Sequence, residues 1–147
     1  MSAMPATRSA DFHLAAAPTR VFPLFTAEGE RAWAPGWEPE MLSGAVERGS
    51  VFRTRQHERD VVWVVTHYDA AAHRVGYARL VEGMNMGLVD VECAADGDGT
   101  RVTVRYTLTP VTAAGAQQVA QLLEAKHYAE FIDEWRVAIS RVLGNAK

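Results

Sequence analysis

Between residues 50 and 109 the chain contains five short segments that have the pattern of β-strands and are separated by only a few turn residues. Parallel neighbours would need crossover connections of a dozen residues or more, so consecutive strands with short links pair antiparallel. This run therefore predicts an antiparallel sheet, around which the rest of the chain must pack. The predicted strands are 50–56, 61–68, 74–81, 87–94 and 101–109.

The last of these segments indicates how it pairs with its neighbour. Apolar residues at 102, 104, 106 and 108 alternate with polar ones, which predicts one buried and one solvated face. The sequence Asp-Gly-Asp-Gly at 96–99 is a strong hairpin signal just before it. Pairing Cys93 with Val102 would then place Val89 opposite Tyr106, and it would leave the acidic residues at 90 and 92 on the solvated face.

The segments on either side of this run differ in character. Residues 1–9 are small and polar and are expected to be flexible, whereas 11–15 has the pattern of a short strand. Pro18 stands where a short helix would begin, and 28–33 would add another turn or two. From Ala116 to Leu143, apolar residues recur at three- and four-residue steps, which predicts one amphipathic helix about 40 Å long. Only the sheet offers this helix a large apolar partner.

Length and composition narrow the class of protein. A chain of 147 residues with 48% hydrophobic and 22% charged residues is typical of one globular domain. The net charge of −3 lacks the basic excess of nucleic-acid binders. We find no apolar run long enough to span a membrane and no signal peptide, so a cytoplasmic protein is expected. The single cysteine, Cys93, cannot form an internal disulfide or a cysteine-based zinc site, and no metal or cofactor is expected.

The order of predicted elements resembles that of the START/Bet v 1-like (SRPBCC) superfamily. The segment Ala17–Phe22 (APTRVF) after the first strand carries part of the resemblance, and three other segments look like a bacterial polyketide cyclase/dehydrase-like subgroup. These three are Glu30–Trp37 (ERAWAPGW), Trp63–Asp69 (WVVTHYD) and Gly99–Tyr106 (GTRVTVRY). Plant members have a glycine-rich loop early in the sheet, but residues 55–60 are charged here, so we assign no phosphate-binding role to them.

The resemblance covers nearly the whole chain and implies an α+β helix-grip fold. In that fold a curved antiparallel sheet wraps around a long C-terminal helix, with two short helices after the first strand. Residues 1–147 would form a single domain of this kind. Members of the superfamily include lipid carriers, hormone receptors and cyclases, so the resemblance specifies the fold more closely than the activity. Exposed strand edges could also pair two copies in a homodimer.

A cavity between sheet and helix would be lined by large apolar side chains with a few polar groups. Trp33 and Trp37 lie in a segment rich in proline and glycine, where they either form the rim of a cavity or plug the end of a small core. The candidate ligand-binding residues are Trp33, Trp37, Trp63, Tyr77, Arg79, Val89, Tyr106, Tyr128, Phe131 and Trp135.

Three residues are candidates for catalysis: His67, Arg79 and Tyr106. His67 is expected on the same strand face as Trp63, where it could serve as a general base. Arg79 faces inward in one register of its strand and solvent in the other, and the general exposure of arginine favours solvent. The chain has no Gly-x-Ser-x-Gly elbow and no dinucleotide-binding or Walker loop, and Cys93 is expected to be a small buried side chain rather than a nucleophile.

Three functions follow from these observations. The first is binding of a small hydrophobic or amphipathic molecule, such as a lipid, a polyketide or an aromatic metabolite. The second is an enzyme of the polyketide cyclase or dehydratase type, which needs a base and an oxyanion donor at one point. The third is a protein-interaction module, which an exposed apolar face at Trp33 and Trp37 would favour. We rank binding first because no strong catalytic constellation is visible.

Overall fold

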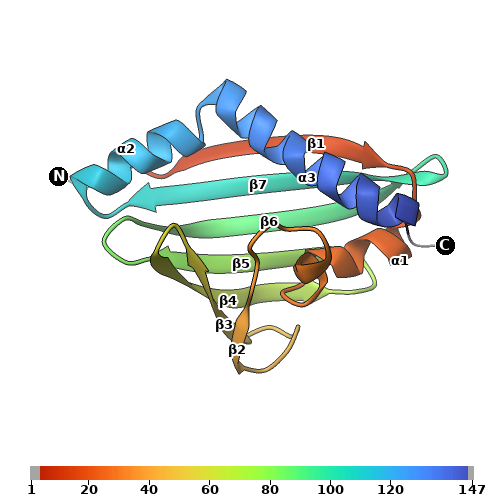
Figure 1. Ribbon diagram of the computed structural model, residues 1–147, viewed down its shortest axis with the longest axis horizontal. Helices are drawn as coiled ribbons and strands as arrows, with labels where there is room; N and C mark the ends of the chain where they lie inside the picture. The colour runs from red at the N-terminus through yellow and green to blue at the C-terminus, as the bar shows by residue number, and fades with distance from the viewer. Residues whose placement is uncertain (1–3, 146–147) are drawn as a thin grey trace.

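The computed structural model describes residues 4–145 and contains one seven-stranded antiparallel sheet with the order β1-β7-β6-β5-β4-β3-β2 (Figure 1). The predicted run of antiparallel strands is therefore confirmed, and each strand lies within two or three residues of its predicted bounds. The short strand β2 was not predicted. The strands are β1 (Ala6–Leu14), β2 (Glu40–Ser43), β3 (Val51–Gln56), β4 (Arg59–Asp69), β5 (Arg74–Val81), β6 (Asn85–Asp96) and β7 (Gly99–Pro110).

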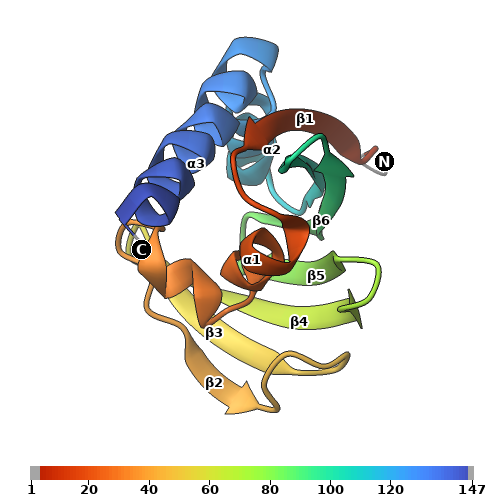
Figure 2. The same cartoon turned by 90° about the vertical axis from the view of Figure 1, so that its right-hand side faces the viewer.

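The helices lie on the concave side of this sheet, which curves from β1 to β2 (Figure 2). Short helices connect β1 to β2, and two longer ones follow β7, so the fold is the expected α+β helix-grip fold. None of the helices in residues 4–145 combines the length and the apolar character needed to cross a bilayer. The helices are α1 (Pro18–Val21), the 3₁₀ turns η1 (Phe22–Phe25) and η2 (Gly29–Ala32), α2 (Ala113–Leu122) and α3 (Ala125–Asn145).

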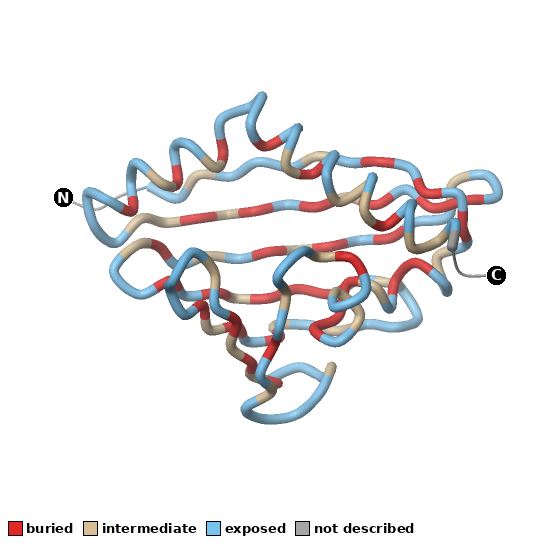
Figure 3. Tube along the Cα trace, in the orientation of Figure 1, coloured by how far each residue is buried: buried red, intermediate tan, exposed pale blue. Residues whose placement is uncertain are grey.

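The predicted register between β6 and β7 is confirmed. Cys93 pairs with Val102 and Val89 with Tyr106, and the hairpin closes where Asp96 meets Gly99. Buried and exposed residues alternate along β7, so its apolar residues face the core (Figure 3). The alternation of residue types was sufficient to fix this pairing, because a slip of one residue would turn every apolar side chain outward.

The first strand is longer than predicted. It begins at Ala6 rather than at Asp11, so residues 6–9 pair with β7 instead of being flexible. Their small polar side chains gave no hydrophobic signal, but the backbone of an edge position needs only a partner strand to become ordered. Residues 1–3 lie outside the described part of the chain.

The single long C-terminal helix was predicted incorrectly, because the structure has two helices separated at residues 123–124. The side chain of Glu124 accepts hydrogen bonds from the backbone N–H groups of Lys126 and His127, so it caps the start of α3. The carbonyl oxygen of Leu123 accepts a hydrogen bond from Arg8 Nε at 2.9 Å instead of continuing the helix. Periodicity alone does not reveal such a break, since the apolar spacing continues across it.

Two helical glycines allow a matched test of the packing. A Cβ on Gly115 of α2 would collide with the backbone carbonyl of Met84, whereas a Cβ on Gly144 of α3 would meet nothing. We expect Gly115→Ala to lower the free energy of unfolding by about 1–3 kcal/mol through overpacking. Gly144→Ala should raise it by up to about 1 kcal/mol, because alanine favours the helix.

Urea unfolding followed by circular dichroism would measure both changes. If the two substitutions changed the free energy of unfolding equally, that result would contradict the close approach of α2 to Met84, in the turn between β5 and β6.

Candidate functional site

The space between the sheet and α3 is filled by aromatic side chains from both layers. Tyr106 of β7 lies 5.8 Å from Phe131 of α3, measured between ring centroids. Trp135 of α3 lies 5.2 Å from Trp33, which precedes β2 in the chain. Contacts of this kind form two groups of rings. One joins Tyr106 to the rings of α3 and to Trp33, and the other consists of Trp37, Phe52, Trp63 and Tyr77. Arg79 lies between the groups and contacts one ring of each. The predicted ligand-binding residues, Trp33, Trp37, Trp63, Tyr77, Arg79, Val89, Tyr106, Tyr128, Phe131 and Trp135, are all buried or half-buried.

The two tryptophans of the proline- and glycine-rich segment pack into different groups of these rings. Trp33 is only 8% exposed, and its indole N–H donates to the carbonyl of Leu24 at 2.7 Å. Trp37 is half-buried, donates to the carbonyl of Ala27 at 2.8 Å, and lies 5.7 Å from Trp63. Of the two expectations for these residues, the structure matches a plug more closely than an exposed rim.

The three tyrosines of the interior differ in how their hydroxyl groups are used. Tyr77 donates to the carbonyl of Phe25 at 2.7 Å, and Tyr128 donates to the carbonyl of Val104 at 2.8 Å. Burial raises the pKa of both phenols above the ordinary value. Among residues 4–145, the Tyr106 hydroxyl has no hydrogen-bond partner. Tyr106 is therefore the one tyrosine of the three whose hydroxyl remains available to another molecule.

Arg79 lies on the inner face of β5, which corrects the expectation that it faces solvent. Val75 and Tyr77 are buried on the same strand, and period-two alternation brings Arg79 inward with them. The residue is 8% exposed, and its Nε and Nη1 atoms have no hydrogen-bond partner in the described chain. Its guanidinium carbon lies 5.4 Å from the ring centroid of Trp63 and 6.0 Å from that of Tyr106.

The environment of Arg79 is costly for a cation. Burial lowers the pKa of the guanidinium, and only the nearby Tyr106 phenol acts in the opposite direction. Cation–π contacts contribute roughly 0.5–2 kcal/mol, whereas removing an ion from water costs several kcal/mol even after relaxation. The rings therefore offset part of the cost of burying this charge and leave the rest uncompensated.

Glu30 is a second ionisable group of the interior, and the sequence analysis missed it. It belongs to η2, and although the residue as a whole is only partly buried, desolvation raises the pKa of its carboxyl well above the ordinary value. It makes no ion pair or hydrogen bond through its side chain within residues 4–145. One signal could have found it: residues three apart eclipse in a 3₁₀ helix, so Glu30 shares a side with the buried Trp33.

Arg79 and Glu30 both act electrostatically on Tyr106. Burial is the main cause that raises the pKa of Tyr106, to about 12. The charge of Arg79 lowers that pKa, and the charge of Glu30 raises it further. A cation, a phenol and a carboxyl group from β5, β7 and η2 therefore share one interior region, lined by aromatic rings.

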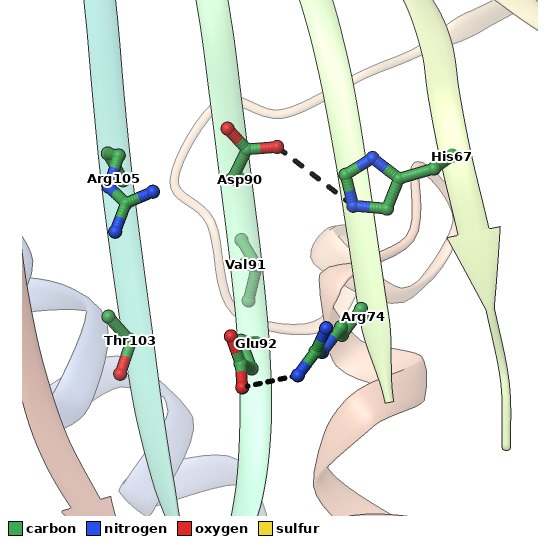
Figure 4. A pocket seen from close by; sticks show the side chains of 7 residues that line it. All are labelled: His67, Arg74, Asp90, Val91, Glu92, Thr103 and Arg105. Atoms are coloured by element: carbon green, nitrogen blue, oxygen red, sulfur yellow. Dashed lines mark hydrogen bonds and ion pairs between the residues drawn. The ribbon is translucent and has the colours of Figure 1, made fainter. Parts of the chain in front are cut away.

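His67 does not belong to this group, and the expectation that it shares a face with Trp63 was wrong. A β-bulge in β4 shifts the pairing with β5 between Val65 and His67, so alternation is reversed after the bulge. His67 is exposed on the convex face, where its Nε2 lies 3.9 Å from Asp90 Oδ1 (Figure 4). The three catalytic candidates therefore do not converge, and only Arg79 and Tyr106 lie together.

Two pockets of the described residues lie outside the aromatic interior. One is a depression of about 70 Å³ on the convex face, lined by His67, Arg74, Asp90, Val91, Glu92, Thr103 and Arg105 (Figure 4). The other, of about 180 Å³, lies where Ala15 faces the end of α3. Both are smaller than the roughly 300 Å³ at which ligand pockets begin.

Two further features of the described residues bear on the chemistry. Residues 4–145 contain no group of three or more histidine, cysteine, aspartate or glutamate side chains that could hold a metal ion. Cys93 is buried, and burial raises the pKa of its thiol to about 12. As expected, this cysteine is a small core side chain.

Comparison with known families gives one match. The model of the family described as polyketide cyclase / dehydrase and lipid transport matches residues 5–134. No curated protein matches the chain in sequence.

Many solved structures share the fold. The crystal structure of Ara h 8.0201 is 17% identical, with a TM-score of 0.71, and the match covers 96% of this chain and 99% of that one. Norcoclaurine synthase from Thalictrum flavum, in complex with dopamine and hydroxybenzaldehyde, is 12% identical with a TM-score of 0.73, covering 99% and 90%. The Mll3558 protein from Rhizobium loti is 21% identical with a TM-score of 0.65, covering 97% and 99%. At these identities the likeness shows the fold alone.

The uncompensated charge of Arg79 predicts an unusual effect on stability. We expect Arg79→Met to raise the free energy of unfolding by about 1–4 kcal/mol, the range found when apolar residues replace buried ionic groups. The control Arg105→Met alters an arginine of the convex face and should change stability by less than about 0.5 kcal/mol. Urea unfolding at pH 7 would compare them. A loss of stability in Arg79→Met would show that the protein itself satisfies this side chain.

The raised pKa of Glu30 predicts a dependence of stability on pH. A carboxyl group whose pKa is higher in the folded state binds more protons when folded, so stability falls as pH rises above its ordinary value of 4.5. We expect Glu30→Gln to be more stable than the wild type at pH 7 and the difference to vanish below pH 4.5. The control is Glu134→Gln, at an exposed position of α3. Unfolding curves at both pH values would test this, and a constant difference would contradict it.

Proposed function

Because the chain belongs to the polyketide cyclase/dehydrase and lipid transport family, we propose that it binds a small hydrophobic or amphipathic molecule between the sheet and α3. The observation that carries this proposal is the aromatic interior with polar groups that have no protein partner. Trp63, Tyr106 and Trp135 offer apolar surface from both layers, and the Tyr106 hydroxyl and Arg79 remain available to orient a ligand.

The dense packing of the interior sets the mode of binding. The rings meet mainly in tilted or edge-to-face arrangements, and side chains of α3 contact Tyr106 from above. Trp135 and Phe131 are only half-buried, as is Trp37, so these rings are more accessible to solvent than the buried ones. A ligand takes the place of such rings, and the apolar area that it covers supplies the affinity.

The family description also names cyclases and dehydrases, and one observation favours an enzyme as the second candidate. The charges of Glu30 and Arg79 shift the pKa of Tyr106 in opposite directions. An ionised Glu30 could take a proton from a carbon beside a carbonyl group, and the electron pair of the broken C–H bond would move to the carbonyl oxygen. Tyr106 and Arg79 would then donate hydrogen bonds to that oxyanion.

The two candidates differ in their dependence on Glu30. An enzyme would lose product formation in Glu30→Gln while keeping its affinity for the ligand. A binding protein would form no product with either side chain at residue 30.

The protein-interaction module, which was the third expectation, loses its supporting observation. It required an exposed apolar face at Trp33 and Trp37. The first of these is buried and the second is half-buried, and both indole N–H groups are bonded to backbone carbonyls of the same chain.

Binding in the interior can be tested with an uncharged apolar fluorophore, N-phenyl-1-naphthylamine. We expect saturable binding of one molecule per chain, because Arg79 and the rings on either side of it form one such position in the interior. In ¹⁵N NMR spectra, the indole N–H signals of Trp63 and Trp135 should shift during the titration, since both rings line that region.

The same spectra contain the control. Leu80 and Leu88 are exposed apolar residues of the convex face, so adsorption there would shift their backbone amides and leave the indole signals unchanged. That pattern, or binding without saturation, would contradict the proposed function.

A further inference from the structure

Arg79 is a buried cation without a counterion. Arginine stays protonated in proteins, so its charge is present at every physiological pH. No carboxylate of residues 4–145 forms an ion pair with it, and this includes Glu30, the acidic side chain of the same interior region. At least two of its donor atoms, Nε and Nη1, are left without an acceptor. Buried charges in proteins are paired almost without exception, so an unpaired one indicates a missing partner.

The contacts of Arg79 hold the guanidinium in place without using its hydrogen-bond donors. Trp63 and Tyr106 both contact it through their rings, at 5.4 and 6.0 Å from ring centroid to guanidinium carbon. Cation–π contacts of this kind offset part of the cost of the buried charge and leave the N–H groups without acceptors. The side chain is therefore positioned, and its N–H groups remain free for an acceptor from outside the chain.

The neighbouring strand carries a second buried polar group without a full set of partners. The register partner of Arg79 on β6 is Gly87. Two residues earlier, Asn85 is 1% exposed and donates through Nδ2 to Gln118 at 2.6 Å, while its Oδ1 has no partner. The inner face of β5 and β6 thus carries unpaired donors and one unpaired acceptor, as expected for the polar end of a ligand site.

We propose that the ligand is an amphipathic anion whose acidic group, a carboxylate or sulfonate-like oxyanion, pairs with Arg79. Its apolar body would lie among the rings between the sheet and α3. This inference rests on the proposed function, since it specifies the ligand of the same interior. An anionic group is the partner that satisfies both unmet needs of Arg79, because it supplies a countercharge and several acceptor oxygens. A neutral ligand would supply acceptors only.

Two fluorophores with the same skeleton test this directly. N-Phenyl-1-naphthylamine is uncharged, and 1-anilinonaphthalene-8-sulfonate carries one sulfonate on that skeleton. We expect the wild type to bind the sulfonate about tenfold more tightly or better, which is the effect of one charged hydrogen bond in a desolvated site. In Arg79→Met this preference should disappear, while the affinity for the uncharged molecule stays within about threefold.

Two more variants separate the interior from other positive sites. Arg105→Met removes an arginine from the pocket on the convex face and should leave the preference intact. Arg79→Lys keeps the charge and should retain a smaller preference, because lysine lacks the planar guanidinium. Arg79→Lys also provides the comparison if Arg79→Met fails to fold.

The outcomes distinguish the two proposals. If neither fluorophore binds, the proposed function is wrong and this inference falls with it. If both bind equally, or if Arg79→Met keeps the preference for the sulfonate, binding stands but the anionic ligand is refuted. If Arg105→Met alone removes the preference, the anion binds at the convex face and the inference is overturned.

Discussion

A straight helix cannot follow the inner face of a curved sheet, and this geometric mismatch governs the rest of the structure. The distance between α3 and the sheet varies along the helix, so only long side chains can bridge it. Trp135 contacts rings of the short-helix segment, of the sheet and of α3 itself. The contact between α3 and the sheet is consequently made by aromatic rings, which have large surfaces and few rotamers.

This aromatic interior strengthens every electrostatic effect within it. In surroundings of low dielectric, an unpaired hydroxyl group is costly. The hydroxyl groups of Tyr77 and Tyr128 donate hydrogen bonds to backbone carbonyls, and these bonds stabilise the fold. Arg79, Glu30 and Tyr106 have no such partners. An apolar residue in place of Arg79 would satisfy the fold at least as well, so the fold alone gives no reason for a cation at this position.

Most of the fold could be predicted from the sequence, because strand alternation and hairpin turns are local signals with one global solution. The β6–β7 register is the clearest case. The predictions failed where a local feature, such as a bulge or a helix cap, interrupts the periodic pattern of apolar residues. A bulge reversed the face of His67, and capping by Glu124 divided the C-terminal helix. Arg79 could not be placed from its own strand, since both faces of 74–81 contain apolar residues. Its orientation depends on which face the neighbouring strands bury.

The two faces of the sheet differ in how their charged side chains are paired. On the convex face, Arg74 meets Glu92 at 3.2 Å, and His67 reaches Asp90 across Gly76, whose missing side chain leaves the path open. These exposed pairs contribute little, about 0–1 kcal/mol each. The concave face shows the opposite arrangement, because the charges for which a partner matters most are left unpaired. An unpaired cation in an aromatic interior is costly for the fold, and the proposed anionic ligand would remove that cost by supplying the missing countercharge.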